Sequence, residues 1–189
     1  IHILFGFMFA CFFLSMWMSN TATAMMMVPI SLSVIKNLEE FYSPDVIRRY
    51  SVAVFLGLAY SCSIGGVSTL IGTPPNLSFA RIYAISFPDA AEISFSMWML
   101  FALPLGLLIL LITLLVLYIL YVPKKNMQNV SRTMLKEKYA ELGPMSREEK
   151  WVGALFVMMA LLWTFRSPIE IGSFRIPGWS QLFSYPGYF

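Results

Sequence analysis

Residues 19–23 read Ser-Asn-Thr-Ala-Thr and interrupt the first apolar stretch of the chain. Residues 1–35 around them contain no Asp, Glu, Lys or Arg. A single helix of that length would extend about 50 Å, well beyond the ~30 Å hydrocarbon core of a bilayer. Two helices that meet at the polar residues would each have about 16 residues, too few to cross comfortably. This pattern predicts a re-entrant helical hairpin over residues 1–37, with residues 19–21 at its tip.

The composition of the chain indicates a membrane protein. Hydrophobic residues make up 58% of the 189 residues and charged residues 12%, whereas soluble domains carry about 25% charged residues. Lipid must therefore cover part of the surface. The small net charge of +3 does not indicate a nucleic-acid partner. The two cysteines, Cys11 and Cys62, lie in apolar runs and are expected to be small core residues rather than a disulfide or a reactive pair.

A second charge-free run, residues 50–80, contains the sequence Gly-Thr-Pro-Pro-Asn at residues 72–76. The prolines lack an N–H group, so a continuing helix would leave backbone carbonyls unpaired. We therefore expect a helix from about residue 49 to residue 63, an unwound loop, and a short helix from about residue 75. Irregular backbone at membrane depth is tolerated only where it is buried in protein or lines a cavity. Residues 50–86 are predicted to form a discontinuous transmembrane helix.

The remaining segments follow from the charge-free runs and from the distribution of Lys and Arg. Transmembrane helices are predicted at 94–123 and 151–166. Because Lys and Arg concentrate in cytoplasmic loops, the basic linker 124–150 and the loop 38–49 are assigned to the cytoplasm. The topology then closes if the hairpin enters and leaves on the cytoplasmic side, with residues 167–189 outside.

The first polar cluster suits a sodium ion. Ser15 and Ser19 are four residues apart and are expected to share one helix face, with Asn20 at the hairpin tip. Neutral hydroxyl, amide and carbonyl oxygens suit a hard monovalent cation, and the break around Gly72 would supply carbonyls, as unwound segments do in secondary transporters. The predicted sodium ligands are Ser15, Ser19, Asn20 and Gly72.

An anion site is expected beside the cation site. Thr21 and Thr73 are expected to precede new helices, and helix N-termini favour anions such as carboxylates. The predicted substrate contacts are Asn20, Thr21, Thr73 and Pro74. Neither broken segment holds Asp, Glu, Lys or Arg, so the sequence favours cation coupling over a proton relay and argues against a metal-dependent membrane hydrolase.

The pairing of Ser-Asn-Thr-Ala-Thr at residues 19–23 with Gly-Thr-Pro-Pro-Asn at residues 72–76 resembles the divalent-anion/sodium symporter family of dicarboxylate, citrate and sulfate transporters. The resemblance is strong to about residue 122 and looser beyond it. It implies the first half of an inverted-repeat transporter, with sodium held by the Ser15, Ser19 and Asn20 side chains and by loop carbonyls around Gly72. It also implies substrate contact by Asn20, Thr21 and Thr73, a homodimer, and an elevator-like movement of the site.

The leading hypothesis is sodium-coupled secondary transport of a small divalent anion, most simply a C4-dicarboxylate such as succinate. No cofactor is expected besides the coupling Na⁺, and the location is expected to be the bacterial inner membrane, as a multi-pass protein. The chain starts within an apolar run without an initiator Met and is expected to be a fragment carrying the first repeat. The alternatives are a sulfate or other oxyanion carrier of the same family, and a non-transporting membrane sensor or enzyme.

Overall fold

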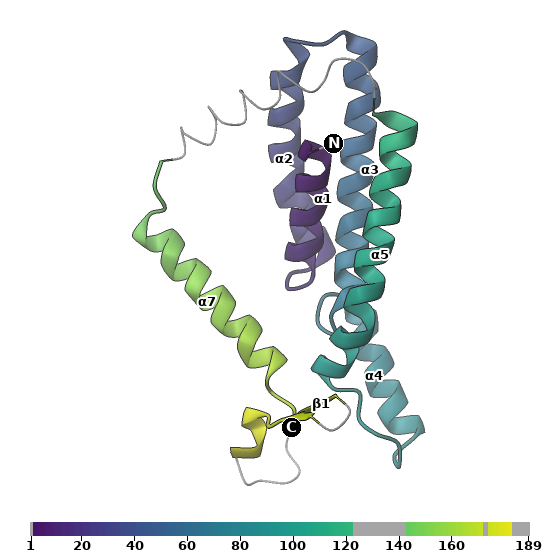
Figure 1. Ribbon diagram of the computed structural model, residues 1–189, viewed down its shortest axis with the longest axis vertical. Helices are drawn as coiled ribbons and strands as arrows, with labels where there is room; N and C mark the ends of the chain where they lie inside the picture. The colour runs from purple at the N-terminus through teal and green to yellow at the C-terminus, as the bar shows by residue number, and fades with distance from the viewer. Residues whose placement is uncertain (1, 123–142, 172–173, 183–189) are drawn as a thin grey trace.

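A computed structural model describes residues 2–122, 143–171 and 174–182, and α-helices dominate these residues (Figure 1). Most of the predicted basic linker, together with the last residues of the predicted external segment, lies outside the described residues. The helices are α1 (His2–Ser15), α2 (Asn20–Glu39), α3 (Pro44–Ser68), α4 (Pro74–Ser86), α5 (Phe95–Tyr121) and α7 (Arg147–Thr164).

Helix α3 is the centre of the helical bundle. It packs against α1, α2 and α5, which surround it in Figure 1. The core consists of apolar side chains that recur every three or four residues on these helices, as expected for packed helix faces. Its largest buried members include Leu4, Met8 and Phe12 of α1, Leu38 of α2, and Val54 of α3.

Glycines on α3 bring α1 unusually close. A Cβ atom added at Gly65 would overlap the backbone carbonyl of Phe12, and one added at Gly57 would lie 2.9 Å from Cγ of Met8. Small residues at such spacing let two helix backbones touch, which is a common way of packing helices where water does not drive association. The position of α1 along α3 is therefore fixed by backbone contact.

Three described helices are long and apolar enough to cross a membrane: α2, α3 and α5. This agrees with a polytopic membrane protein. However, α2 has 20 residues because it continues through Lys36 to Glu39. The expectation that both arms of the hairpin are too short to cross is therefore right in length for α1, which has 14 residues, and wrong for α2. The re-entrant placement is not decided by helix length.

The second predicted break is present, but it is shorter than expected. Helix α3 begins at Pro44 and continues to Ser68, five residues beyond the expected end, and α4 begins at Pro74. The helix continues because Gly65 packs closely against Phe12 of α1 and Gly66 against Asn20 of α2, and these tertiary contacts offset the weak helix propensity of glycine. The irregular segment is confined to residues 69–73.

The C-terminal part of the described chain lies at the side of the bundle in Figure 1. Helix α7 is followed by a short antiparallel pair of strands, β1 (Ile169–Ile171) and β2 (Phe174–Ile176), and by the 3₁₀ turn η1 (Trp179–Leu182). The strand pair is a small addition to a helical fold. The Oγ atom of Ser96 at the start of α5 donates a 2.5 Å hydrogen bond to the Thr164 carbonyl and joins the two parts.

Candidate functional site

The turn between α1 and α2 contains the predicted hairpin tip. Helix α1 ends at Ser15, and α2 begins at Asn20 with Ser19 as its N-cap, where Oγ of Ser19 accepts a 3.2 Å hydrogen bond from the Ala22 N–H. Ser15 and Ser19 therefore do not share a helix face, because the helix ends between them. Thr21 is the second residue of α2 and not the cap, so α2 begins two residues earlier than expected.

Three oxygen atoms converge at this turn. Oγ of Ser15 lies 2.6 Å from Oδ1 of Asn20 and 2.7 Å from the backbone carbonyl oxygen of Cys62 on α3. The Ser15 side chain is fully buried. A hydroxyl group has a single hydrogen and can donate it to only one of two acceptors at a time. A cation among the three oxygens would be coordinated by all of them, without this competition for one hydrogen.

Gly66 allows Asn20 to reach α3. A Cβ atom at position 66 would overlap Oδ1 of Asn20, and a Cβ atom at Gly72 would lie 2.9 Å from the Gly66 Cα. Gly66 thus lies next to Asn20 at the hairpin tip and also next to Gly72, whose carbonyl is a predicted sodium ligand. The structure brings Asn20 and Gly72 close to the same glycine, although they are 52 residues apart in the sequence.

Two buried polar side chains connect the breaks. The Thr69 hydroxyl donates a 2.5 Å hydrogen bond to the Met16 carbonyl and accepts a 3.0 Å bond from the Gly72 N–H. The Asn76 amide donates to the carbonyls of Gly66 (3.0 Å) and Thr69 (2.7 Å). These bonds satisfy backbone groups that the helix ends leave unpaired. Each break is therefore held by side-chain hydrogen bonds rather than left open.

The second helix N-terminus of the site is that of α4. Thr73 has the extended backbone of an N-cap, and Pro74 occupies the first helical position, as the sequence predicts. The Thr73 side chain makes no capping hydrogen bond and is half-buried, whereas Pro74 and Thr21 are exposed. The Thr73 hydroxyl is therefore available to an anion, whereas the first two residues of α4, Pro74 and Pro75, have no N–H group and the Asn76 N–H bonds to the Thr73 carbonyl at 3.2 Å.

Two fully buried hydroxyl groups have no hydrogen-bond partner within the described residues: Oγ1 of Thr23 and Oγ of Ser61. Thr23 lies one turn beyond Asn20 on α2, and Ser61 precedes Cys62 on α3. A buried unpaired hydroxyl costs about 1–3 kcal/mol. Two hydroxyl groups near the oxygen cluster thus remain free to form hydrogen bonds. The sequence did not indicate this, because a Thr or Ser in an apolar run is usually a packing residue.

The oxygen cluster contains no acidic group. Nowhere in the described part of the chain do three or more His, Cys, Asp or Glu side chains gather as metal ligands would. Neutral oxygens at the meeting of two helix breaks suit a weakly charged cation. Residues 2–176 match a family model described as the sodium:sulfate symporter transmembrane region. The chain belongs to this symporter family. The family consists of transporters, so the alternative of an enzyme or sensor is set aside.

Known relatives of this symporter chain agree with the family. The sodium-dependent dicarboxylate transporter SdcS of Staphylococcus saprophyticus is 39% identical over 171 residues, which cover 87% of this chain and 32% of that protein. SdcS of Staphylococcus aureus strain USA300 is 39% identical over 170 residues, with the same coverage. The symporter chain thus spans about one third of the length of these relatives.

Sequence reasoning missed three groups of this candidate site. The Cys62 carbonyl belongs to a regular helix. Every residue type has the same main-chain oxygen, so the sequence cannot identify which carbonyl binds an ion. Thr69 and Gly66 lie in the irregular stretch that the sequence identified, but their partners are on another helix. A buried threonine inside a charge-free run was the available signal, since such a hydroxyl must find a partner.

Proposed function

We propose that this chain supplies one half of the sodium and anion site of a secondary transporter for a small divalent anion, a C4-dicarboxylate such as succinate. The observation that carries the proposal is the cluster of Ser15 Oγ and Asn20 Oδ1 at the break between α1 and α2, beside the Cys62 carbonyl of α3. The family and the names of the relatives, which describe sodium-dependent dicarboxylate transporters, support the same conclusion.

In this proposal sodium binds between the Ser15 hydroxyl, the Asn20 amide oxygen and main-chain carbonyls. The Cys62 carbonyl is added to the ligands expected from the sequence, and the Gly72 backbone lies close to Gly66. Ser19 contributes less, because its exposed hydroxyl already caps α2. Without the cation, rotation of the Asn20 amide by half a turn would present Nδ2 to Ser15 and satisfy both groups.

The anion binds next to the cation in this proposal, at the N-termini of α2 and α4. At α2 the N–H groups of the first turn and the positive end of the helix dipole favour a carboxylate. At α4, where Pro74 and Pro75 have no N–H group, the helix dipole and the uncapped Thr73 hydroxyl take this role. Asn20, Thr21, Thr73 and Pro74 remain the proposed contacts. Asn20 belongs to both sites, so sodium at Asn20 would fix the start of α2 in the position that the anion needs. Such sharing gives a physical basis for coupled binding.

The wider arrangement is also part of the proposal. Residues 1–37 form a re-entrant hairpin that opens to the cytoplasm, and the helices around residues 50–86 form the discontinuous crossing. The chain is a fragment whose partner half-site comes from a second repeat of the full-length protein. The complete transporter is a homodimer in the bacterial inner membrane that moves the site by an elevator-like motion.

The substitution Asn20→Ala in the full-length protein tests the assignment. We expect loss of sodium-dependent succinate uptake, because the variant lacks an oxygen shared by both sites, while the protein still reaches the membrane. Asn37→Ala is the matched control, since it removes the same side chain near the other end of α2. Wild-type uptake by the Asn20 variant would refute the site.

Sulfate is the second candidate substrate, because the description of the matching family names a sodium:sulfate symporter. Competition separates the two candidates. For a dicarboxylate carrier, excess succinate displaces labelled succinate and excess sulfate does not. Displacement by sulfate at comparable concentrations would favour the oxyanion carrier.

A further inference from the structure

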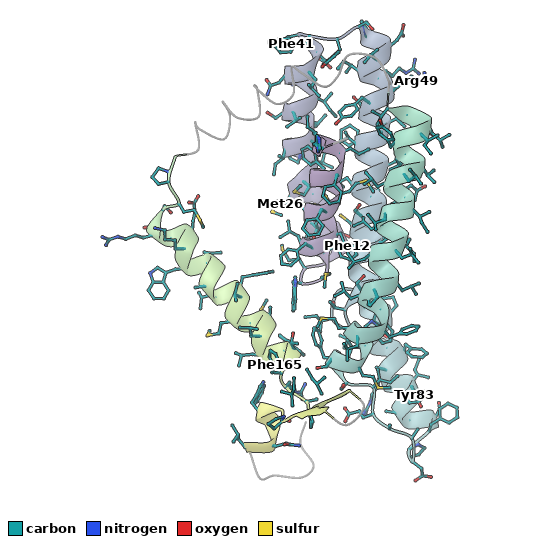
Figure 2. The ribbon with its side chains drawn as sticks, in the orientation of Figure 1. Phe12, Met26, Phe41, Arg49, Tyr83 and Phe165 are labelled. Atoms are coloured by element: carbon teal, nitrogen blue, oxygen red, sulfur yellow. The ribbon has the colours of Figure 1, made fainter. Side chains whose placement is uncertain are left out.

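A groove with a volume of about 730 Å³ lies at the end of the bundle where α2 passes into α3. Figure 2 labels Phe41 and Arg49 at this end, far from the oxygen cluster. The groove walls come from the last turn of α2, the connecting turn and the first three turns of α3. The lining residues are Glu39, Tyr42, Pro44, Ile47, Arg48, Ser51, Val52, Phe55 and Leu56.

The lining changes from charged to apolar along one face of α3. Val52 is four residues after Arg48, and Phe55 and Leu56 are three and four residues after Val52, so these residues lie on the same side of the helix. No charged residue follows on α3 beyond Arg49. Both α2 and α3 are long and apolar enough to cross a membrane, and in the proposed membrane placement their junction lies at the cytoplasmic boundary. The groove is therefore lined by charged residues at the end that faces water and by apolar residues further along α3.

The mouth of the groove holds two opposite charges. Glu39 and Arg48 both line it, and no ion pair within the described residues joins either of them to a partner. Ser51 adds a hydroxyl oxygen that can accept a hydrogen bond, because its hydrogen is donated to the Ile47 carbonyl at 2.8 Å. A ligand that carries one negative and one positive group above an apolar chain would complement this mouth.

We propose that the groove binds phosphatidylethanolamine, a zwitterionic aminophospholipid. The phosphate pairs with the guanidinium of Arg48, the ammonium donates hydrogen bonds to Glu39, and one acyl chain lies along Val52 and Phe55. Basic pockets between membrane helices commonly bind lipid headgroups, and here the added carboxylate selects the headgroup. The inference rests on the membrane placement in the proposed function, and it does not depend on the substrate or on the coupling ion.

The charges predict a ranking of lipids. Phosphatidylglycerol offers the phosphate but brings no cation to Glu39, so its negative charge is repelled by that carboxylate. Phosphatidylcholine has a cation without N–H groups and cannot donate to Glu39. A partly exposed ion pair changes affinity by about two- to fivefold. Phosphatidylethanolamine should therefore be retained at least about twofold better than either of the other lipids.

Native mass spectrometry of the full-length protein in detergent tests the ranking, with the three lipids added at equal concentration and with identical acyl chains. We expect Glu39→Gln to abolish the preference for phosphatidylethanolamine, and Arg48→Gln to weaken retention of all three lipids. Glu40→Gln and Arg49→Gln are matched controls, because each removes the same charge from a neighbouring residue that does not line the groove.

A third variant tests the apolar part of the groove independently of its charged residues. Val52→Trp fills the apolar part and leaves Glu39 and Arg48 unchanged, so it should lower lipid retention to the level of Arg48→Gln. Equal retention of the three lipids by the wild type would overturn the proposal, and so would an effect of Glu40→Gln as large as that of Glu39→Gln. Full retention by Val52→Trp would also overturn it, because the groove would then be filled by another part of the full-length protein. Sodium-dependent uptake is measured separately, so failure of transport leaves the lipid result unaffected.

Discussion

The hydroxyl of Thr69 donates its hydrogen to the carbonyl of Met16 across two helix breaks that are 53 residues apart in the sequence. The same hydroxyl accepts the N–H of Gly72. One buried side chain therefore satisfies main-chain groups at the end of α1 and in the break after α3. This relationship ties the turn that holds Asn20 to the loop that is proposed to contribute a sodium-binding carbonyl.

Replacing Thr69 with valine keeps the shape of the side chain and removes both hydrogen bonds. The Met16 carbonyl and the Gly72 N–H would then be buried without partners, at a cost of about 1–3 kcal/mol. We expect a lower melting temperature of the full-length protein in detergent. Thr113→Val is the control, because the Thr113 hydroxyl bonds only to Ile109 within α5. Equal melting temperatures for the two variants would contradict the linking role of Thr69.

Adding one methyl group at Gly66 should displace Asn20. The Cβ atom of Gly66→Ala would occupy the space of the Asn20 amide oxygen, so the amide must move away from Ser15. We expect sodium-dependent uptake to need a much higher sodium concentration for half-maximal rate. The control is Gly153→Ala on α7, where no atom lies within 4 Å of the added Cβ. Unchanged sodium dependence in Gly66→Ala would place the cation elsewhere.

Removing the Ser15 hydroxyl should weaken sodium binding without removing the helix end. Contacts to charged groups contribute about 1.5–3 kcal/mol, or roughly 10- to 100-fold in affinity. We expect Ser15→Ala to raise the sodium concentration for half-maximal succinate uptake by that factor. Ser31→Ala is matched in burial, and its hydroxyl bonds to the Met27 carbonyl of its own helix at 2.9 Å. A similar response of both variants would contradict a sodium ligand at Ser15.

The absence of acidic and basic residues from residues 50–80 and 1–35 predicts the coupling ion. Reconstituted full-length protein should accumulate succinate when a sodium gradient is imposed, and a protonophore should not stop the uptake. An imposed proton gradient without sodium should give no accumulation, because proton relays in membranes use titratable side chains. Accumulation driven by protons alone would contradict sodium coupling through this site.

The helices could be predicted from the sequence because their apolar runs are long and their interruptions are chemically distinct. Proline at residue 74 fixes the start of α4, whereas the end of α3 was placed five residues early. Glycine pairs weaken an isolated helix, but Gly65 and Gly66 lie inside α3 because α1 and Asn20 pack against them. That contact is tertiary and cannot be read from neighbouring residues.

The site could be predicted in part for a similar reason. Ser15 and Asn20 are brought together, as the sequence leads one to expect of polar residues in an apolar run. The prediction that Ser15 and Ser19 share a helix face was wrong, because residues four apart lie on one face only within a continuous helix. The Cys62 carbonyl was missed, since any residue type carries the same oxygen.

The backbone contact between Gly65 and Phe12 limits how α1 can move. If α1 slid by one turn toward the start of α3, Phe12 would face Ser61 in place of Gly65, and Ser61 carries the Cβ atom for which there is no room. Sliding is therefore blocked in that direction. The distance between Ser15 and the Cys62 carbonyl is set by a mechanical stop made of main-chain atoms. Mutations along this contact could thus retune ion affinity without touching any atom that meets the ion.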